Sequence, residues 1–434
     1  MHQPATIDPR PASAVSAGVG FAGLVGLFAW AGVAWTYHLD GPFAALSAIL
    51  AGGVPMVLWS LLVDRVHRNP STGIDWSGPP RPWREALDTG LVKLAGLWAT
   101  WGLIACLYCL ARWYWQGNYL FAMHCLQAFL PLLLIASIPY VLLLERRLVN
   151  PHDGLWTFGN WLMGGGAGPE ARAKLADHAR AWTIKGFFTA FMLAGVPGNW
   201  QNVIDIDVRG LLGNPVALAA DLIAVMFMID MCLATVGYLL TMRPLDSHIR
   251  SANPFASGWT AALICYPPFV LMNTGGPLDY HHGELGWARA MSDHPMLQPV
   301  FAAALIVLTG IYAWATMAFG LRFSNLTHRG IITNGPYRWS KHPAYLSKNL
   351  FWWIAGLPML TTTGLWTDAV RNTLIMAIVS GVYYWRARTE EAHLSADPAY
   401  VAYAGWMARN VTITRAFARI GRRRRAEPVG VPAE

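Results

Sequence analysis

Charged residues are scarce in this chain of 434 residues, and their scarcity excludes an ordinary soluble domain. Asp, Glu, Lys and Arg make up 13% of the sequence and hydrophobic residues 55%, whereas soluble domains carry about 25% charged residues. We expect no cleavable signal peptide, because the first apolar run, Val15 to Tyr37, is too long for one and lacks a small-residue cleavage site. The composition indicates an all-α, polytopic integral membrane helical bundle.

Cysteine is rare too, and all five cysteines lie within apolar runs. Cys106 and Cys109 have C-x-x-C spacing, but a Leu- and Trp-rich helix is a poor place for a metal or redox site. We interpret them as small packing residues. The Gly-rich segment from Gly164 to Gly168 lacks the Lys-Ser/Thr pair of a phosphate-binding loop, so we expect a cytoplasmic turn there. No metal site is predicted.

The chain does contain long apolar runs, and about 20 apolar residues suffice to cross a bilayer. Ten candidate spans follow in order, of which the fifth, seventh and ninth are short: Val15–Tyr37, Phe43–Val63, Leu91–Trp113, Tyr119–Leu144, Trp182–Val196, Pro215–Thr241, Ala256–Met272, Met296–Gly320, Ala344–Leu360 and Thr367–Tyr384. We expect one continuous bundle with three parts: a membrane scaffold of about eight helices (residues 1–320), a helical hairpin with the site (321–410) and a basic cytoplasmic tail (411–434).

Lys and Arg residues are distributed unequally between alternate loops. Of the 32 in the chain, one side holds all except Arg112, Arg209, Arg289 and Arg371. Since cytoplasmic loops carry the excess of Lys and Arg, both termini are predicted to be cytoplasmic. The same rule explains the net charge of +8 without a nucleic-acid partner. We interpret the Arg422–Arg425 run as an anchor for anionic membrane lipids or for topology.

Two polar features of the scaffold have more than one interpretation. Asp221 and Asp230 lie inside the sixth run, where an ionisable residue marks a functional interior or is a neutral acid bonded to a neighbouring helix. Nine residues apart, they face roughly opposite sides of a helix, so one shared carboxylate site is not expected. The outward loop from Asn273 to Pro295 is rich in His and carboxylates but has no i, i+4 ligand pair. We interpret it as a solvated lid.

Polar residues gather at the two ends of the last hairpin. The first end, Gly335 to Trp353, reads GPYRWSKHPAYLSKNLFWW, and the second, Arg386 to Leu394, reads RARTEEAHL. The first offers aromatic rings and a His-Pro pair, which suit a heteroaromatic ring or a cation. Arg386 and Glu390 share one helix face at i, i+4 spacing, and Glu391 lies about 100° round. The alternative is an aromatic belt with surface ion pairs at a membrane interface.

The ordered pattern G-P-Y-R-x-x-K-H-P-x-Y, then R-x-x-x-E-E-x-x-L and Y-x-x-Y, resembles the C-terminal signature of the isoprenylcysteine carboxyl methyltransferase family. Related membrane phospholipid methyltransferases end similarly. The resemblance spans about Arg322 to Arg409 and implies an all-helical membrane bundle that binds S-adenosylmethionine from the cytosol. It implies the following roles: His342 and Tyr345 contact the cofactor, Tyr337 and Pro343 shape its pocket, Glu391 holds a polar part of it, and Arg386 and Glu390 lie near the methyl acceptor.

We therefore expect an S-adenosylmethionine-dependent methyltransferase of the bacterial inner (cytoplasmic) membrane, acting on a hydrophobic or lipid-linked acceptor at the cytoplasmic face. A carboxylate acceptor is ionised near pH 7 and needs no base, so Arg386 would orient it. For an amine or thiol, Glu390 is the candidate base. Carboxylate is slightly favoured. The alternatives are a transporter or channel whose path includes Asp221, Asp230 and the outward loop, and a non-catalytic membrane receptor.

Overall fold

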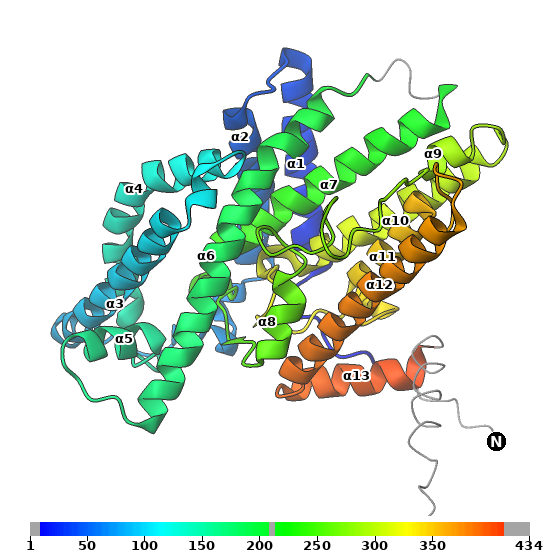
Figure 1. Ribbon diagram of the computed structural model, residues 1–434. Coiled ribbons are helices and arrows are strands. Elements are labelled where there is room, and N and C mark those ends of the chain that lie inside the picture. Colours follow the sequence, from blue (N-terminus) through cyan, green and yellow to red (C-terminus); the bar gives the residue numbers. More distant parts are fainter. Residues whose placement is uncertain (1–8, 208–212, 412–434) are drawn as a thin grey trace, which may run out of the picture.

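The computed structural model describes residues 9–207 and 213–411, and its regular structure is almost entirely helical (Figure 1). The helices are α1 (Ala17–Tyr37), α2 (Pro42–Leu58), α3 (Trp83–Leu110), α4 (Tyr119–Glu145), α5 (Gly154–Leu162), α6 (Pro169–Ile204), α7 (Pro215–Leu239), α8 (Ala256–Leu263), α9 (Trp287–Ala290), α10 (Gln298–Phe319), α11 (Pro343–Gly356), α12 (Trp366–Leu394) and α13 (Pro398–Asn410). Two short strands, β1 (Ser251–Ala252) and β2 (Thr327–His328), pair antiparallel. The predicted all-α class is confirmed. The Arg422–Arg425 run and nearly all of the predicted basic tail lie outside the described residues.

Six helices of the described segments are long and apolar enough to cross a membrane. They match the first four, the sixth and the eighth predicted spans, and their bounds are Ala17–Tyr37, Pro42–Val63, Trp83–Leu110, Tyr119–Glu145, Pro215–Leu239 and Gln298–Arg322. Pro55 interrupts the second, which ends in a wider helical turn from Trp59 to Val63, as expected where proline removes a backbone hydrogen bond. An integral membrane protein is therefore indicated, while ten spans and cytoplasmic termini stay predictions.

The remaining four predicted spans take different forms. The fifth lies within α6, a continuous helix of 36 residues. The seventh is not one continuous helix, because α8 ends at Leu263 after eight residues. The chain then turns through Pro267 and Pro268, which cannot donate helical hydrogen bonds. The ninth, α11, has 14 residues and spans about 21 Å, less than the roughly 30 Å hydrocarbon core. The tenth, α12, continues beyond its apolar run to Leu394, as the spacing of the second motif required.

The scaffold and the hairpin share one hydrophobic core. In Figure 1, α3, α4 and α5 lie on one side of the molecule and α10 to α12 on the other, with α6 and α7 between them. The largest cluster of buried apolar side chains joins Trp200 of α6 and Leu233 of α7 to Ala315 of α10 and to Tyr337 in the first motif. Burial of this shared surface stabilises the two parts together. The structure therefore agrees with one continuous bundle.

Local backbone features fix the motif region. Gly335 has φ of +53°, and a Cβ there would lie 3.1 Å from Nε1 of Trp314, so glycine permits the turn that opens the first motif. Pro343 occupies the first turn of α11, where its missing N–H costs nothing. Asp397 caps α13 by accepting a hydrogen bond from the Ala399 N–H at 2.8 Å. These features place α11 and α13 on either side of the end of α12.

Candidate active site

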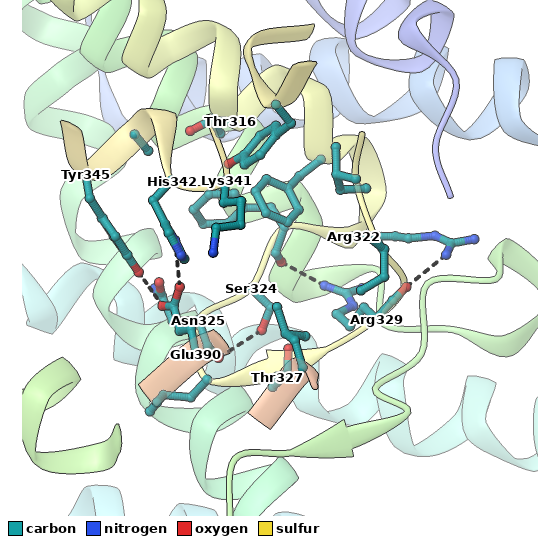
Figure 2. A pocket seen from close by; sticks show the side chains of 18 of the residues that line it. Thr316, Arg322, Ser324, Asn325, Thr327, Arg329, Lys341, His342, Tyr345 and Glu390 are labelled. Atoms are coloured by element: carbon teal, nitrogen blue, oxygen red, sulfur yellow. Dashed lines mark hydrogen bonds and ion pairs between the residues drawn. The ribbon is translucent and has the colours of Figure 1, made fainter. Parts of the chain in front are cut away.

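A cavity lined by charged, polar and aromatic side chains lies where α10, α11, α12 and α13 meet the loop that follows α10 (Figure 2). About 160 Å³ of it is open to the centres of water-sized molecules, which is room for several waters or a ligand. Five of the predicted site residues line it: Tyr337, His342, Tyr345, Arg386 and Glu390. Pro343 and Glu391 do not. Trp339, whose ring was expected to contribute, is exposed and also lies outside the lining.

Arg386 is buried in the wall of this cavity, with a side chain 3% exposed. Its Nη2 donates to Oδ1 of Asn325 at 2.6 Å and to the Tyr266 hydroxyl at 3.4 Å. Its Nε lies 3.6 Å from Oε1 of Glu390, in ion-pair contact but beyond a hydrogen bond, and has no hydrogen-bond partner. The i, i+4 spacing does bring Arg386 and Glu390 together, but Asn325 makes the closest polar contact with the guanidinium. A buried guanidinium N–H without a partner is a ready donor to an anionic ligand.

Glu390 also contacts two side chains at the start of α11. Figure 2 shows Tyr345, whose hydroxyl donates to Oε1 of Glu390, and His342, whose Nδ1 lies 3.9 Å from Oε2. The rings of His342 and Tyr345 stack with centroids 5.7 Å apart and an interplanar angle of 7°. The two residues are three positions apart at the start of α11, which puts them on one helix face. The two halves of the motif therefore meet at Glu390.

Glu391 points to a different set of partners. Its Oε1 accepts from Nε2 of His342 at 3.1 Å and from Lys341, and its Oε2 accepts from Nη1 of Arg388 at 2.7 Å. Burial acts to raise the pKa of Glu391, but the hydrogen bonds from His342 and Lys341 outweigh it and lower the pKa to about 2. Glu391 is therefore anionic at neutral pH. Glu391 is not part of the cavity lining. It contacts His342 and Lys341, which both line the cavity.

Tyr337 and Pro343 contribute to the walls of the site in different ways. The Tyr337 ring packs edge-on against Phe319 at 5.3 Å between centroids. Its carbonyl accepts a hydrogen bond from the Tyr403 hydroxyl at 2.6 Å. This bond ties α13, which carries the Y-x-x-Y pair, to the first motif. Pro343 is buried at the start of α11 and acts on the backbone.

The loop after α10 supplies site residues that sequence reasoning missed. Arg329 is 2% exposed and donates to four backbone carbonyls, those of Ser247 at 2.6 Å, Gly237 at 2.9 Å, Phe323 at 2.7 Å and Leu321 at 2.9 Å. One guanidinium thus fixes the loop that presents Asn325 to Arg386. In the sequence, Arg329 is one basic residue of a cytoplasmic loop, and no local signal separates it from the others.

A buried ion pair ties the same loop to the N-terminal scaffold. Arg322 lies 2.6 Å from Oδ2 of Asp246, and both side chains are at most 4% exposed. The same oxygen accepts hydrogen bonds from Asn69 at 3.0 Å and Ser71 at 2.7 Å, in the connection between α2 and α3. Residues some 250 positions earlier in the chain therefore help to hold this loop in place. A local sequence motif cannot predict such a contact.

Asp230 is buried beside the cavity, outside its lining. Its two oxygens accept hydrogen bonds from two α10 hydroxyls, those of Tyr312 at 2.7 Å and of Thr316. Tyr312 in turn accepts from Nζ of Lys348 at 3.3 Å. Asp230 is thus bonded to a neighbouring helix, as one of the two interpretations expected, and its neighbours line the cavity.

The outward loop contains an ion pair of its own. In the outward loop, Nδ1 of His281 lies 3.0 Å from Oδ1 of Asp279, and Arg371 of α12 donates to the Asp279 carbonyl at 3.0 Å. Within residues 9–207 and 213–411, no group of three or more His, Cys, Asp or Glu side chains is arranged to hold a metal ion. The loop is therefore tied to α12 by hydrogen bonds.

A family model matches the part of the chain that supplies most of the cavity lining. Residues 297–396 match the model of the isoprenylcysteine carboxyl methyltransferase (ICMT) family. The match includes α10, α11 and α12 and both ends of the hairpin, so the resemblance predicted from the motifs is confirmed for this C-terminal part. No curated protein and no solved structure matches the chain. The chain thus has helices that could cross a membrane, and its residues 297–396 are similar to the isoprenylcysteine carboxyl methyltransferase family.

Proposed function

We propose that this chain is a methyltransferase that uses S-adenosylmethionine to methylate a hydrophobic or lipid-linked acceptor at the cytoplasmic face of the membrane. One observation carries the proposal. The two ends of the hairpin, 45 positions apart, converge through Tyr345 and Glu390 on one polar cavity, within the segment that matches a methyltransferase family. A membrane-edge cavity suits a reaction between a water-soluble donor and a lipid-soluble acceptor.

The lining of the cavity fits a ligand that is both aromatic and charged. The stacked rings of His342 and Tyr345 offer flat faces to an aromatic base or a sulfonium cation. Tyr337 walls the same space, and the buried hydroxyl of Tyr400 has no hydrogen-bond partner. Glu391 would act on the cofactor by fixing His342 and Lys341, and Pro343 by fixing the start of α11. The bound cofactor supplies an electrophilic methyl group, so the protein's task is to bind and align.

Arg386 is proposed to orient the acceptor, for which a carboxylate is favoured. Its Nε has no hydrogen-bond partner, while Asn325 holds its Nη2. A carboxylate supplies the acceptor that this donor lacks. It is ionised near pH 7 and attacks the methyl carbon as it stands. The amine or thiol alternative needs a base, and Glu390 is the carboxylate in place for it.

The transporter and receptor alternatives have less structural support. Both oxygens of Asp230 accept hydrogen bonds from α10, whereas an ion path would need them available. Residues Asp221 and Asp230 also differ in burial, since only Asp230 is buried. A receptor would bind the cofactor without turnover, so transfer of the methyl group separates it from the enzyme.

Methyl transfer from labelled S-adenosylmethionine to a membrane extract tests the acceptor class. With a carboxylate acceptor, Arg386→Lys is the more damaging change, about tenfold or more in rate, because Lys cannot supply the planar fork. The parent rate should then be flat above pH 6. A rate that rises with pH, together with a nearly inactive Glu390→Gln variant, would favour an amine or thiol and Glu390 as base. If both variants transfer methyl like the parent, this pair does not carry the chemistry.

A further inference from the structure

The inner end of the cavity holds a lysine that uses little of its hydrogen-bonding capacity. Lys348 lines the cavity from α11, about one helical turn beyond Tyr345. Its Nζ donates to Oη of Tyr312 at 3.3 Å, and this is its one hydrogen bond or ion pair among the described residues. An ammonium has three donors. Two of the three N–H donors of Lys348 therefore have no hydrogen-bond partner among the described residues, and the side chain lines a cavity.

A buried carboxylate of the scaffold sets the position of this ammonium. Tyr312 and Thr316 both donate to Asp230, one to each oxygen, so the Tyr312 oxygen is left to accept from Lys348. The ammonium also lies over the rings of Tyr312, 4.4 Å from the centroid, and of Trp352, at 5.9 Å. Asp230 belongs to α7, outside the segment 297–396. The scaffold thus contributes a buried carboxyl group that fixes the side chains around Lys348.

The other cations of the cavity wall are engaged by the protein itself. Arg322 pairs with Asp246, Arg329 donates to backbone carbonyls and Lys341 pairs with Glu391. Within the described part of the chain Lys348 is in no ion pair, and Arg386, which contacts Glu390 and donates to Asn325 through Nη2, keeps its Nε free of hydrogen bonds. Glu390 is the one carboxylate among the lining residues. A purely hydrocarbon ligand beside Lys348 would leave charged N–H groups buried without partners, which is costly.

We propose that Lys348, positioned by Asp230 through Tyr312, is a specificity-determining residue that binds the anionic head group of the acceptor together with Arg386. The word acceptor rests on the proposed function, but the preference for an anion does not require turnover. Lys348 and Arg386 outnumber Glu390, the one carboxylate among the lining residues, so this part of the cavity attracts a carboxylate and repels an ammonium. The site therefore selects an anionic amphiphile over an amine or an alcohol that carries the same chain.

Equilibrium binding of three matched amphiphiles tests this selectivity. The full-length protein in nanodiscs is titrated, without cofactor, with radiolabelled hexadecanoate, hexadecylamine and hexadecanol. The parent should bind hexadecanoate at least about tenfold more tightly than either of the others. Lys348→Met should lose that preference, and Lys348→Arg should keep most of it. Asp230→Asn should lower the preference about three- to fivefold, because the ammonium remains but is no longer anchored.

The controls separate a role in selectivity from a role in folding. Lys174→Met removes an exposed lysine that pairs with Glu170 on α6 and should leave all three affinities unchanged. Lys348→Gln replaces the ammonium with an uncharged polar group, and it must lose the preference even if Lys348→Met fails to fold. A parent without a preference for hexadecanoate, or a folded uncharged variant that keeps it, overturns the inference. Failure of the proposed function has a different signature, which is no binding of S-adenosylhomocysteine by the parent.

Discussion

At the residue scale, Glu391 is the carboxylate that keeps His342 and Lys341 in place. Its pKa is about 2, below the ordinary value of 4.5, so its ionisation stabilises the fold fully above about pH 4.5, and this contribution is lost as the pH falls toward 2. We expect Glu391→Gln to lower the free energy of unfolding at pH 7 by about 2–3 kcal/mol.

The difference in unfolding free energy between the parent and Glu391→Gln should shrink by roughly 2 kcal/mol between pH 6 and pH 3, because acid protonates Glu391 first in the unfolded parent, where its pKa is 4.5, and so favours unfolding. Denaturant unfolding of the two proteins in detergent at both pH values measures it. A gap between the two proteins that stays constant down to pH 3 would show that Glu391 has no strongly lowered pKa in the fold.

The sequence could predict contacts within one helix but not those across the fold. The i, i+4 spacing predicts that Arg386 and Glu390 meet, and they do, at 3.6 Å. The closest polar contact with the guanidinium is with Asn325, 61 positions earlier in an irregular loop, where helical periodicity gives no information. The partner of Asp230 could likewise be expected only as a neighbouring helix, since Tyr312 lies 82 positions away.

At the scale of elements, the loop between α10 and α11 is organised by a single side chain. We expect Arg329→Lys to destabilise the protein by about 2–4 kcal/mol, because one ammonium cannot reach all four carbonyls that the guanidinium binds, and buried carbonyls are left without donors. The loss should appear in the temperature of unfolding. Arg338→Lys changes an exposed arginine of the next turn and should leave that temperature nearly unchanged. Equal stability of the two variants would contradict this role for Arg329.

Element boundaries followed the sequence where proline or a cap marks them. Pro343 is the first residue of α11 and Asp397 caps α13, positions that suit these residue types. The predicted seventh span is not one continuous helix for a related reason, because mean hydropathy ignores the two prolines that follow α8. Apolar composition alone could not show that residues 264–272 pack irregularly, with Cys265 and Met272 against the α12 residues Met376 and Val379.

At the scale of the whole molecule, the account requires the cavity and the outward loop to lie on opposite sides of the membrane. In a variant without Cys106 and Cys109, which are exposed, a cysteine at Ser395 should react with a membrane-impermeant maleimide only after permeabilisation. A cysteine at His282 should react in intact cells. The positive-inside distribution of Lys and Arg is the physical reason. Labelling of both positions from the same side would refute the predicted topology and the access of a cytosolic cofactor.

Calorimetric titration of S-adenosylmethionine into the purified full-length protein is the most direct test of the central claim. We expect the parent to bind at a single site and His342→Ala to bind about ten- to a hundredfold more weakly, because this variant loses a stacked ring and the ligand-facing partner of Glu391. The matched control Trp339→Ala removes an exposed ring outside the cavity and should bind like the parent. No binding by the parent, or equal affinity of the parent and His342→Ala, would contradict the assignment of this cavity as a cofactor site.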